Sequence, residues 1–189
     1  MKFLVKALRI VDMEPKRFVS PEKTLAEIGI DKKSIVIDFG SGSGHWTIAA
    51  AKSLGPSGKV FAVDNNEDLL KRLSSMAMLG GYGNVVTKFT NLLTLDQKDI
   101  SSADLSILAN TLSFFKMNEI IIKKAFEMTK EKGKLLVVEW KKQDHGFGPP
   151  DHQRVGKKEL LELAKKTGFN LLGEIPAGHY HYAIVFEKP

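Results

Sequence analysis

The stretch "SIVIDFGSGSGHWT", residues 34–47, decides the fold. A short apolar run ends at Asp38, and Gly40, Gly42 and Gly44 then alternate with serines. A short apolar run of this kind predicts a buried strand, and the alanine-rich sequence that follows the glycines predicts a helix. Glycines between the two elements allow positive φ and let a ligand approach the backbone closely. The stretch therefore predicts a strand, a ligand-binding loop and a helix.

The spacing of the glycines in residues 40–44 separates this loop from two phosphate-binding loops. A P-loop needs a lysine after its last glycine, where His45 and Trp46 stand here. A dinucleotide loop, G-x-G-x-x-G, would need glycine at His45 or Thr47. Asp38 also places a carboxylate next to the loop, which repels a pyrophosphate and attracts a cation. A ligand with a cationic amino-acid part and no phosphate, such as S-adenosylmethionine, fits both observations.

A second acid follows at the end of the next predicted strand. The segment "KVFAVD", residues 59–64, ends in Asp64, which comes 20 residues after Gly44. Acidic residues at this position hydrogen-bond ribose hydroxyls in related nucleotide-binding folds. Capping of the following helix is the alternative role for Asp64.

The rest of the chain alternates strand-like and helix-like patterns, which predicts an α/β fold with a mainly parallel sheet. A final strand with apolar/polar alternation predicts antiparallel pairing at the C-terminus. We expect a Rossmann-like, seven-stranded, mostly parallel sheet with a C-terminal antiparallel strand and helices on both faces. Its ligand should bind at the carboxyl ends of the strands. The predicted strands are 34–39, 59–64, 84–89, 103–110, 133–140, 170–176 and 179–188, and the predicted helices are 21–30, 45–54, 66–79, 118–129 and 157–169.

Composition favours an ordinary globular protein. The 189 residues suit a single domain, 1–189, in which residues 1–20 form an N-terminal extension that can act as a lid over cofactor or substrate. No apolar run reaches the roughly 20 residues of a membrane span, and the opening segment does not resemble a signal peptide. The absence of cysteine excludes disulfides and thiolate sites, and we expect a cytoplasmic protein. The net charge of +6 comes from dispersed lysines, so nucleic acid is a less favoured partner.

Together these features resemble the class I S-adenosylmethionine-dependent methyltransferases. The resemblance lies in residues 36–44, 60–70, 103–115, 133–140 and 152–169. Within that class, "HQRVGKKELLELAKKTGF" and "HYHYAIVFEK" resemble the small methyltransferases of ubiquinone and menaquinone biosynthesis. The resemblance implies S-adenosylmethionine as cofactor, S-adenosylhomocysteine as product, and transfer of a methyl group to a small-molecule acceptor by in-line displacement.

The resemblance also implies a set of cofactor-binding residues in or after the first four strands. Asp38 would orient the methionine ammonium, Asp64 would hold the ribose diol, and Asn65 would lie along the adenine. Asn91 stands where the family often has an acid for the adenine amino group. Asn110 would lie below the methyl donor, unless it is a turn residue. The full set is Asp38, Gly40, Ser41, Gly42, Gly44, Asp64, Asn65, Asn91, Leu92 and Asn110.

Several better-defined subgroups do not match. The segment "ANTLSF" after the fourth strand lacks the prolines of enzymes that methylate exocyclic amines on DNA. Asn110 replaces the aspartate of the ribose 2′-O-methyltransferases, and arsenite methyltransferases need cysteines. The acceptor stays open, with an RNA or protein methyltransferase and a non-catalytic S-adenosylmethionine-binding module as the alternatives.

Candidate acceptor-side residues lie mostly after the fifth strand, in a glycine- and proline-rich loop of the length typical of lids and binding loops. A histidine there can act as a base, or can be a solvated surface residue. Arg154 can clamp an acidic substrate or cap a helix. The candidates are Phe18, Trp140, His145, His152, Arg154 and Tyr180. No catalytic residue and no metal site are predicted, although His179 and His181 share one strand face. The oligomeric state, monomer or homodimer, is left open.

Overall fold

The computed structural model describes residues 18–189, except residues 97, 99, 116, 144–145 and 147. The predicted N-terminal extension therefore lies outside the described residues, apart from residues 18–20.

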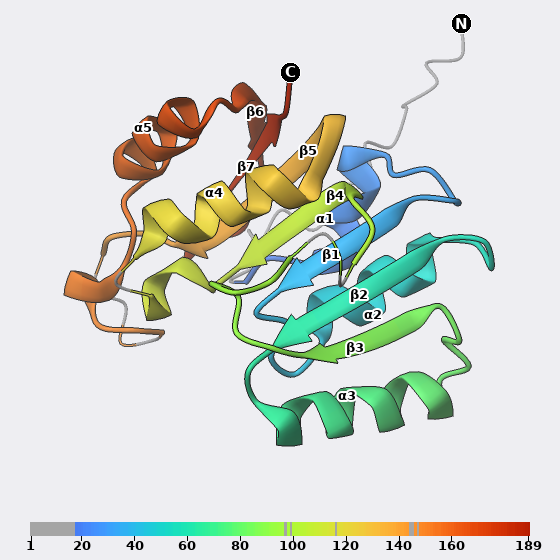
Figure 1. Ribbon diagram of the computed structural model, residues 1–189. Helices are drawn as coiled ribbons and strands as arrows, with labels where there is room; N and C mark the ends of the chain where they lie inside the picture. Colours follow the sequence, from blue (N-terminus) through green and yellow to red (C-terminus); the bar gives the residue numbers. More distant parts are fainter. Residues whose placement is uncertain (1–17, 97, 99, 116, 144–145, 147) are drawn as a thin grey trace, which may run out of the picture.

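One seven-stranded sheet organises the molecule, in the order β3-β2-β1-β4-β5-β7-β6 (Figure 1). The pairs among β1 to β5 are parallel, and β7 runs antiparallel to both β5 and β6. This confirms the predicted fold class. The order reverses between β1 and β4, which makes their carboxyl ends the switch point where such folds bind ligands. The strands are β1 (Ile35–Phe39), β2 (Lys59–Asp64), β3 (Val85–Phe89), β4 (Ala103–Ala109), β5 (Thr129–Trp140), β6 (Asn170–Ile175) and β7 (His181–Glu187).

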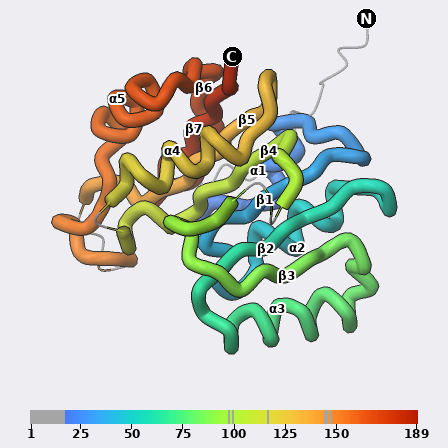
Figure 2. Tube along the Cα trace, viewed as in Figure 1, coloured from blue at the N-terminus to red at the C-terminus, as the bar shows by residue number. Residues whose placement is uncertain are grey.

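Helices cover both faces of the sheet (Figures 1 and 2). Buried residues of α1, α2 and α3 pack on one face, and those of α4 and α5 pack on the other. Within the described residues, no helix is long and apolar enough to cross a membrane. The α-helices are α1 (Pro21–Ile28), α2 (His45–Ser53), α3 (Glu67–Leu79), α4 (Asn118–Met128) and α5 (Lys157–Thr167), and the 3₁₀ turns are η1 (Leu112–Phe114) and η2 (Asp151–Gln153).

Capping residues set the helix boundaries that the sequence predicts. The Ser20 side chain accepts a hydrogen bond from the Lys23 N–H at the start of α1, and Gly29 ends the helix with φ 67°. Asn65 and Asn66, before α3, are both of a residue type that commonly caps helices. The structure selects Asn66, whose Oδ1 accepts from the Leu69 N–H at 3.1 Å.

Strand β5 differs from its predicted start at Gly133. It begins at Thr129, directly after α4, and pairs there with Ala103 before the register shifts towards Leu105. The residues of this extension are mostly polar and show no apolar alternation, so the sequence pattern does not predict it as a strand. Its backbone is held instead by the C-terminal segment, because the Lys132 N–H donates to the Lys188 carbonyl at 2.8 Å.

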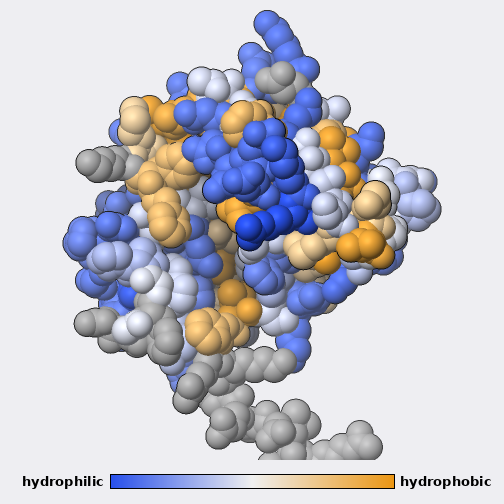
Figure 3. Space-filling model, turned by 90° about the horizontal axis from the view of Figure 1, so that it is seen from below, coloured by the Kyte–Doolittle hydropathy of each residue, from blue (hydrophilic) through white to orange (hydrophobic). Residues whose placement is uncertain are grey.

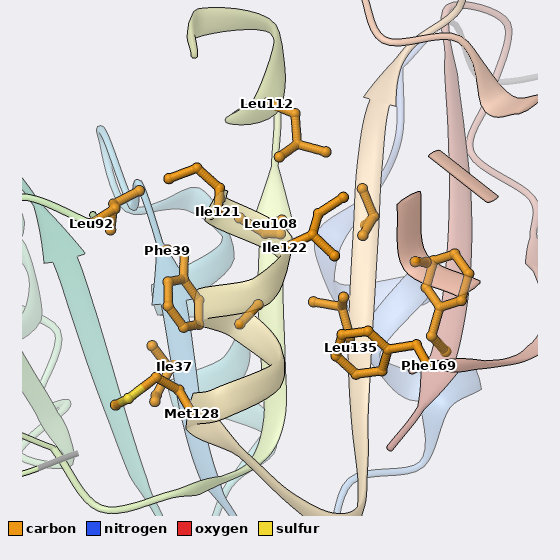
Figure 4. Packing of buried hydrophobic residues seen from close by; sticks show 14 of the residues in the cluster. Ile37, Phe39, Leu92, Leu108, Leu112, Ile121, Ile122, Met128, Leu135 and Phe169 are labelled. Atoms are coloured by element: carbon orange, nitrogen blue, oxygen red, sulfur yellow. The ribbon is translucent and has the colours of Figure 1, made fainter. Parts of the chain in front are cut away.

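The larger hydrophobic cluster lies between the sheet and α4 with α5. Phe39 and Leu135 from the sheet meet Ile121 and Ile122 from α4 (Figure 4), and all four side chains are fully buried. Branched and aromatic side chains that leave no access to water supply the main stabilisation of such a domain. The cluster fixes the positions of β1, β4 and β5, whose ends carry the site described below.

The exposed apolar side chains are scattered over the surface. The last turn of α3 exposes Met78 and Leu79 at 76% and 84% of their areas. Seen from below, the molecule has a largely hydrophilic surface with separate hydrophobic areas (Figure 3). No single continuous apolar face is visible from that side.

Gly44 provides the first prediction, because the packing of α2 against α3 leaves it no room for a side chain. It caps α2 with φ 85°, and a Cβ atom there would lie 2.3 Å from Leu73 Cδ1. Strained φ and overpacking each cost about 1–3 kcal/mol. Gly44→Ala should lower the free energy of unfolding by about 2–4 kcal/mol in urea denaturation.

Two control variants separate the cost of the strained φ from the cost of overpacking. Gly29→Ala has a positive φ without any contact, and Gly83→Ala has neither. We expect an intermediate loss for Gly29→Ala and almost none for Gly83→Ala. Equal stability of all three variants would contradict the packing explanation.

Candidate functional site

The glycine loop after β1 is tied to the end of β2. Gly40 and Gly42 adopt φ values of 72° and 52°, which favour glycine. The N–H groups of Gly40 and Ser41 both donate to the Val63 carbonyl, at 2.8 and 3.0 Å. A Cβ atom on Gly42 would have no neighbour closer than 3.9 Å. The backbone at Gly42 is therefore open for a ligand to approach.

Asp64 fixes this loop through its carboxylate. Its Oδ2 accepts the Gly42 N–H and its Oδ1 accepts the Asn66 N–H, both at 2.8 Å. One buried side chain thus joins the glycine loop to the start of α3. Each carboxylate oxygen has a further lone pair, so Asp64 can still accept two hydroxyl donors from a ligand.

Asp38 lies beneath the loop and is 1% exposed. The Thr47 hydroxyl donates to its Oδ2 at 2.6 Å. The pKa of Asp38 is raised to about 6, mainly because the side chain is buried; the Thr47 hydrogen bond lowers this pKa and the nearby charge of Asp64 raises it. A cation above the loop would favour the charged form of this carboxyl.

The opposite wall of the site begins where β4 ends. Asn110 has φ 55°, a left-handed conformation that asparagine tolerates better than most residues, and its N–H donates to the Val138 carbonyl at 2.8 Å. The Thr111 hydroxyl donates to the Phe39 carbonyl at 2.8 Å. A Cβ atom on Gly40 would lie 2.9 Å from Thr111 Cγ2. The loop and the wall are therefore packed directly against each other.

Glu139, near the end of β5, holds this wall in place. Its Oε1 accepts the Leu112 N–H at 2.7 Å, and its Oε2 accepts the Ser113 hydroxyl at 2.8 Å. The side chain is fully buried, and burial raises its pKa to about 7 although these hydrogen bonds lower it. A strand carboxylate thus anchors η1, which carries the aromatic side chains of the wall.

Between the loop and the wall lies a pocket of about 390 Å³. Six of the ten predicted cofactor residues line it, together with three that the sequence analysis does not single out. The lining residues are Gly40, Gly42, Asp64, Asn65, Leu92, Asn110, Thr111, Phe114 and Phe115. The signal for the last three was the segment "TLSFF", which is apolar directly after a strand end.

The other four predicted cofactor residues do not line this pocket. Asp38 lies beneath the loop, and Gly44 faces Leu73 of α3. Asn91 is exposed, and its Oδ1 accepts the Leu93 N–H in a local turn. Ser41 is buried within the loop. A role for these four residues in supporting the loop or extending the site stays a prediction.

Two buried polar atoms at the site lack hydrogen-bond partners. They are Asn110 Oδ1 in the pocket wall and Ser41 Oγ in the glycine loop. Buried polar atoms are nearly always satisfied, so an unpaired acceptor beside a pocket indicates a polar ligand. The donor set here, a carboxylate, an amide oxygen and open backbone, suits hydroxyl and ammonium groups better than phosphate.

Three of the predicted acceptor-side residues come together at the carboxyl end of β5. The Phe18 ring lies 6.4 Å from Trp140 and 5.1 Å from Tyr180, measured between ring centroids. His181 joins them, with its ring 4.1 Å from that of Trp140. From the sequence, His181 is considered only as a metal ligand, together with His179. Among the described residues, no group of three or more His, Asp or Glu side chains is arranged to hold a metal ion.

The other three predicted acceptor-side residues are Arg154, His152 and His145, and they do not belong to this aromatic group. Arg154 is 4% exposed and donates to the carbonyls of Pro149, Lys141 and Gln143, while its guanidinium lies 5.7 Å from the Trp140 ring. This geometry supports a structural role in fixing the loop. His152 is exposed on η2, and His145 lies outside the described residues.

Comparison with known proteins agrees with this fold and site. A family profile described as "Methyltransferase domain" matches residues 30–171. The chain belongs to this methyltransferase-domain family. The predicted resemblance to class I methyltransferases of the ubiquinone and menaquinone type is confirmed.

Curated relatives are similar over part of their length. One is the demethylmenaquinone methyltransferase of Anoxybacillus flavithermus, 27% identical over 128 residues, which are 66% of this chain and 52% of that protein. Another, from Geobacillus kaustophilus, is 30% identical over 80 residues, 42% of this chain and 34% of that protein. The chain thus spans about half the length of the first of these relatives.

Solved structures share the fold at low identity. A SAM-dependent methyltransferase from Aquifex aeolicus has a TM-score of 0.82 at 22% identity, with 91% of both chains covered. The [4+2]-cyclase SpnF has a TM-score of 0.75 at 15% identity, covering 89% of this chain and 80% of that one. Because a protein titled as a cyclase shares the fold, the fold alone does not define the reaction.

Glu139 leads to a prediction about pH. Its raised pKa means that the folded protein binds this proton more tightly than the unfolded chain does. Its contribution to the free energy of unfolding should therefore be most favourable below about pH 4.5 and decrease as the pH rises to about 7. Glu139→Gln removes this ionisation, so its stability relative to wild type should rise by about 1–3 kcal/mol from pH 5 to pH 8.

Chemical denaturation of both proteins at the two pH values measures this difference. The comparison cancels Asp38, whose raised pKa acts in the same direction in both proteins. Glu131→Gln, at an exposed position of β5, is the matched control and should show no such change. A constant difference between Glu139→Gln and wild type across this range would show that Glu139 does not titrate as described.

Proposed function

We propose that the chain is an S-adenosylmethionine-dependent methyltransferase that acts on a small-molecule acceptor. The main support is the pocket at the switch point of the sheet. It combines the free lone pairs of Asp64, open backbone at Gly42 and the unpaired Asn110 Oδ1. Membership of the methyltransferase-domain family supports the same reaction class.

The residues of the pocket suit the different parts of this cofactor. Asp64 has acceptor capacity for the two ribose hydroxyls, and Asn65 and Leu92 offer a surface for the adenine. The glycine loop and Asn110 would face the amino-acid part. Asp38 supplies a buried negative charge beneath the loop, which attracts a cationic ligand at short range. A bound S-adenosylmethionine would provide a methyl group on a positively charged sulfur.

Alignment and exclusion of water are the tasks left to the protein. In-line methyl transfer needs the acceptor atom to be held close to the methyl group, along the axis of the bond that breaks. Phe114 and Phe115 provide an aromatic wall at the pocket, and Glu139 fixes the turn that carries it. A base is required only where the acceptor must lose a proton.

A small-molecule acceptor is supported by two observations. The curated relatives are named as demethylmenaquinone methyltransferases. In addition, Phe18, Trp140 and Tyr180 form an aromatic group at the same edge of the sheet as the pocket. A compact aromatic group of this kind suits a small apolar body.

Calorimetric titration with S-adenosylhomocysteine tests cofactor binding. Asp64→Ala removes both acceptors for the ribose and the hydrogen bond that holds Gly42. Hydrogen bonds to charged groups contribute about 1.5–3 kcal/mol each, so affinity should fall at least about tenfold. Asp68→Ala, on the exposed first turn of α3, is the matched control and should bind as wild type does.

Thermal melts of both variants exclude unfolding as the cause. Absence of S-adenosylhomocysteine binding in the wild type would refute the proposed cofactor. Unchanged affinity in a folded Asp64→Ala variant would show that the ribose is held elsewhere.

A further inference from the structure

A second pocket, of about 810 Å³, opens beside the aromatic group. Its walls come from α1, the end of β5, the start of α5 and the segment between β6 and β7. We call it the lysine pocket, after Lys23, Lys141, Lys142 and Lys157, which line it.

The charge of the lysine pocket is not balanced by its own acids. Glu27 and Glu174 are the lining acids among the described residues, so four lysines less two glutamates leave an excess of two positive charges. Lys157 pairs with both oxygens of Glu174, at 2.7 and 2.6 Å. Lys141 donates to the Gly178 carbonyl at 3.2 Å, which leaves its charge uncompensated. An excess of this kind attracts an anion.

The start of α5 adds to this positive potential. Gly156 caps the helix without a side-chain hydrogen bond, and the first turn carries two lysines, Lys157 and Lys158, and one acid, Glu159. Lysines at a helix N-terminus are unfavourable by themselves, because the helix dipole is positive there. Gly156 and Lys157 both line the pocket. An anion bound at this point would interact with the N–H groups of the first turn, which have no carbonyl partner within the helix.

His181 gives an independent indication of a ligand. Its side chain lines the lysine pocket and is 3% exposed, yet neither ring nitrogen has a hydrogen-bond partner. Burial lowers its pKa to about 4, and the charges of Lys141 and Arg154 lower it as well, so the ring is neutral near pH 7. A neutral imidazole offers one donor and one acceptor, and a buried pair of this kind left unsatisfied is unfavourable.

Apolar residues make up much of the remaining lining, beside the polar residues Ser20, Thr24 and His179. Val19, Ile175, Pro176 and Ala183 contribute aliphatic surface, and Phe18 contributes an aromatic ring that also contacts Tyr180. A ligand that fills this volume needs a rigid apolar body as well as an acidic group.

We propose that the lysine pocket binds the methyl acceptor, and that the acceptor is an aromatic carboxylate with a polar ring substituent. The carboxylate would lie at the lysines and the start of α5, the ring on the apolar lining, and the substituent at His181. This inference rests on the proposed function, because it takes the pocket at Asp64 as the cofactor site.

The register of the sheet supports the link between the two pockets. Only β5 separates β4 from β7. The Asn110 N–H donates to Val138 of β5, and Trp140 of β5 pairs with His181. Neighbouring strands lie about 4.8 Å apart, so the backbones of Asn110 and His181 are separated by about 10 Å. The residues that border the two pockets therefore lie at the same edge of the sheet.

Fluorescence titration with 6-hydroxy-2-naphthoate, in the presence of S-adenosylhomocysteine, tests this proposal. We expect saturable binding and at least about tenfold weaker binding of the uncharged amide of the same acid. The double variant Lys142→Gln, Lys157→Gln should weaken binding of the acid by about tenfold, without weakening binding of the amide. Lys165→Gln, in the last turn of α5 and outside the pocket, is the control.

A second variant tests the role of His181. His181→Phe keeps an aromatic ring at this position and removes both nitrogens. It should reduce the affinity for 6-hydroxy-2-naphthoate several-fold and leave that for 2-naphthoate unchanged. Equal binding of acid and amide, or wild-type affinities in both pocket variants, would overturn the proposal.

Calorimetry with S-adenosylhomocysteine on the same variants separates this proposal from the proposed function. The variants of the lysine pocket should retain cofactor affinity, since none of these residues lines the pocket at Asp64. Loss of acid selectivity with normal cofactor binding would reject only the acceptor class. Failure of the wild type to bind S-adenosylhomocysteine would reject the cofactor assignment instead.

Discussion

The carboxylate of Asp64 is the interaction on which the geometry of the site depends. It accepts the N–H of Gly42 from the glycine loop and the N–H of Asn66 from the start of α3. Two loops that follow neighbouring strands are therefore fixed relative to each other by one side chain. The glycine loop in turn packs on Thr111, and that segment is held by Glu139 from β5. Hydrogen bonds and packing contacts thus connect the carboxyl ends of β2, β1, β4 and β5, so that a change in one member affects its neighbours.

Much of this arrangement could be predicted from the sequence, because its causes are local. Strand patterns, helix caps and the glycine spacing all act within a few residues, and they predict that Gly42, Asp64 and Asn110 lie at or directly after strand ends, where the structure has them lining the pocket. The other parts depend on contacts between distant segments. Leu73 of α3 leaves no room for a side chain at position 44. Glu139 of β5 accepts a hydrogen bond from Leu112, which follows the neighbouring strand β4. Neither contact leaves a periodic pattern that could be read along the chain.

The two pockets carry opposite charge. The carboxyls of Asp38, Asp64 and Glu139 lie at or beneath the site at the switch point, whereas the lysine pocket has four lysines and two glutamates in its lining. The raised pKa values of Asp38 and Glu139 show that burial, more than any partner, governs these two acids. This difference in charge suits a reaction in which a cationic donor and an anionic acceptor each bind in their own pocket.

The insertion of β7 between β5 and β6 has a consequence for how this protein can change. Because β7 runs antiparallel to both neighbours, the turn from Pro176 to Tyr180 lies at the same edge as the glycine loop, yet shares no hydrogen bond with it among the described residues. Residues can be added, removed or exchanged in that turn without altering the strands that hold Asp64 and Asn110. This turn can thus vary independently of the pocket at Asp64, as surface connections commonly do.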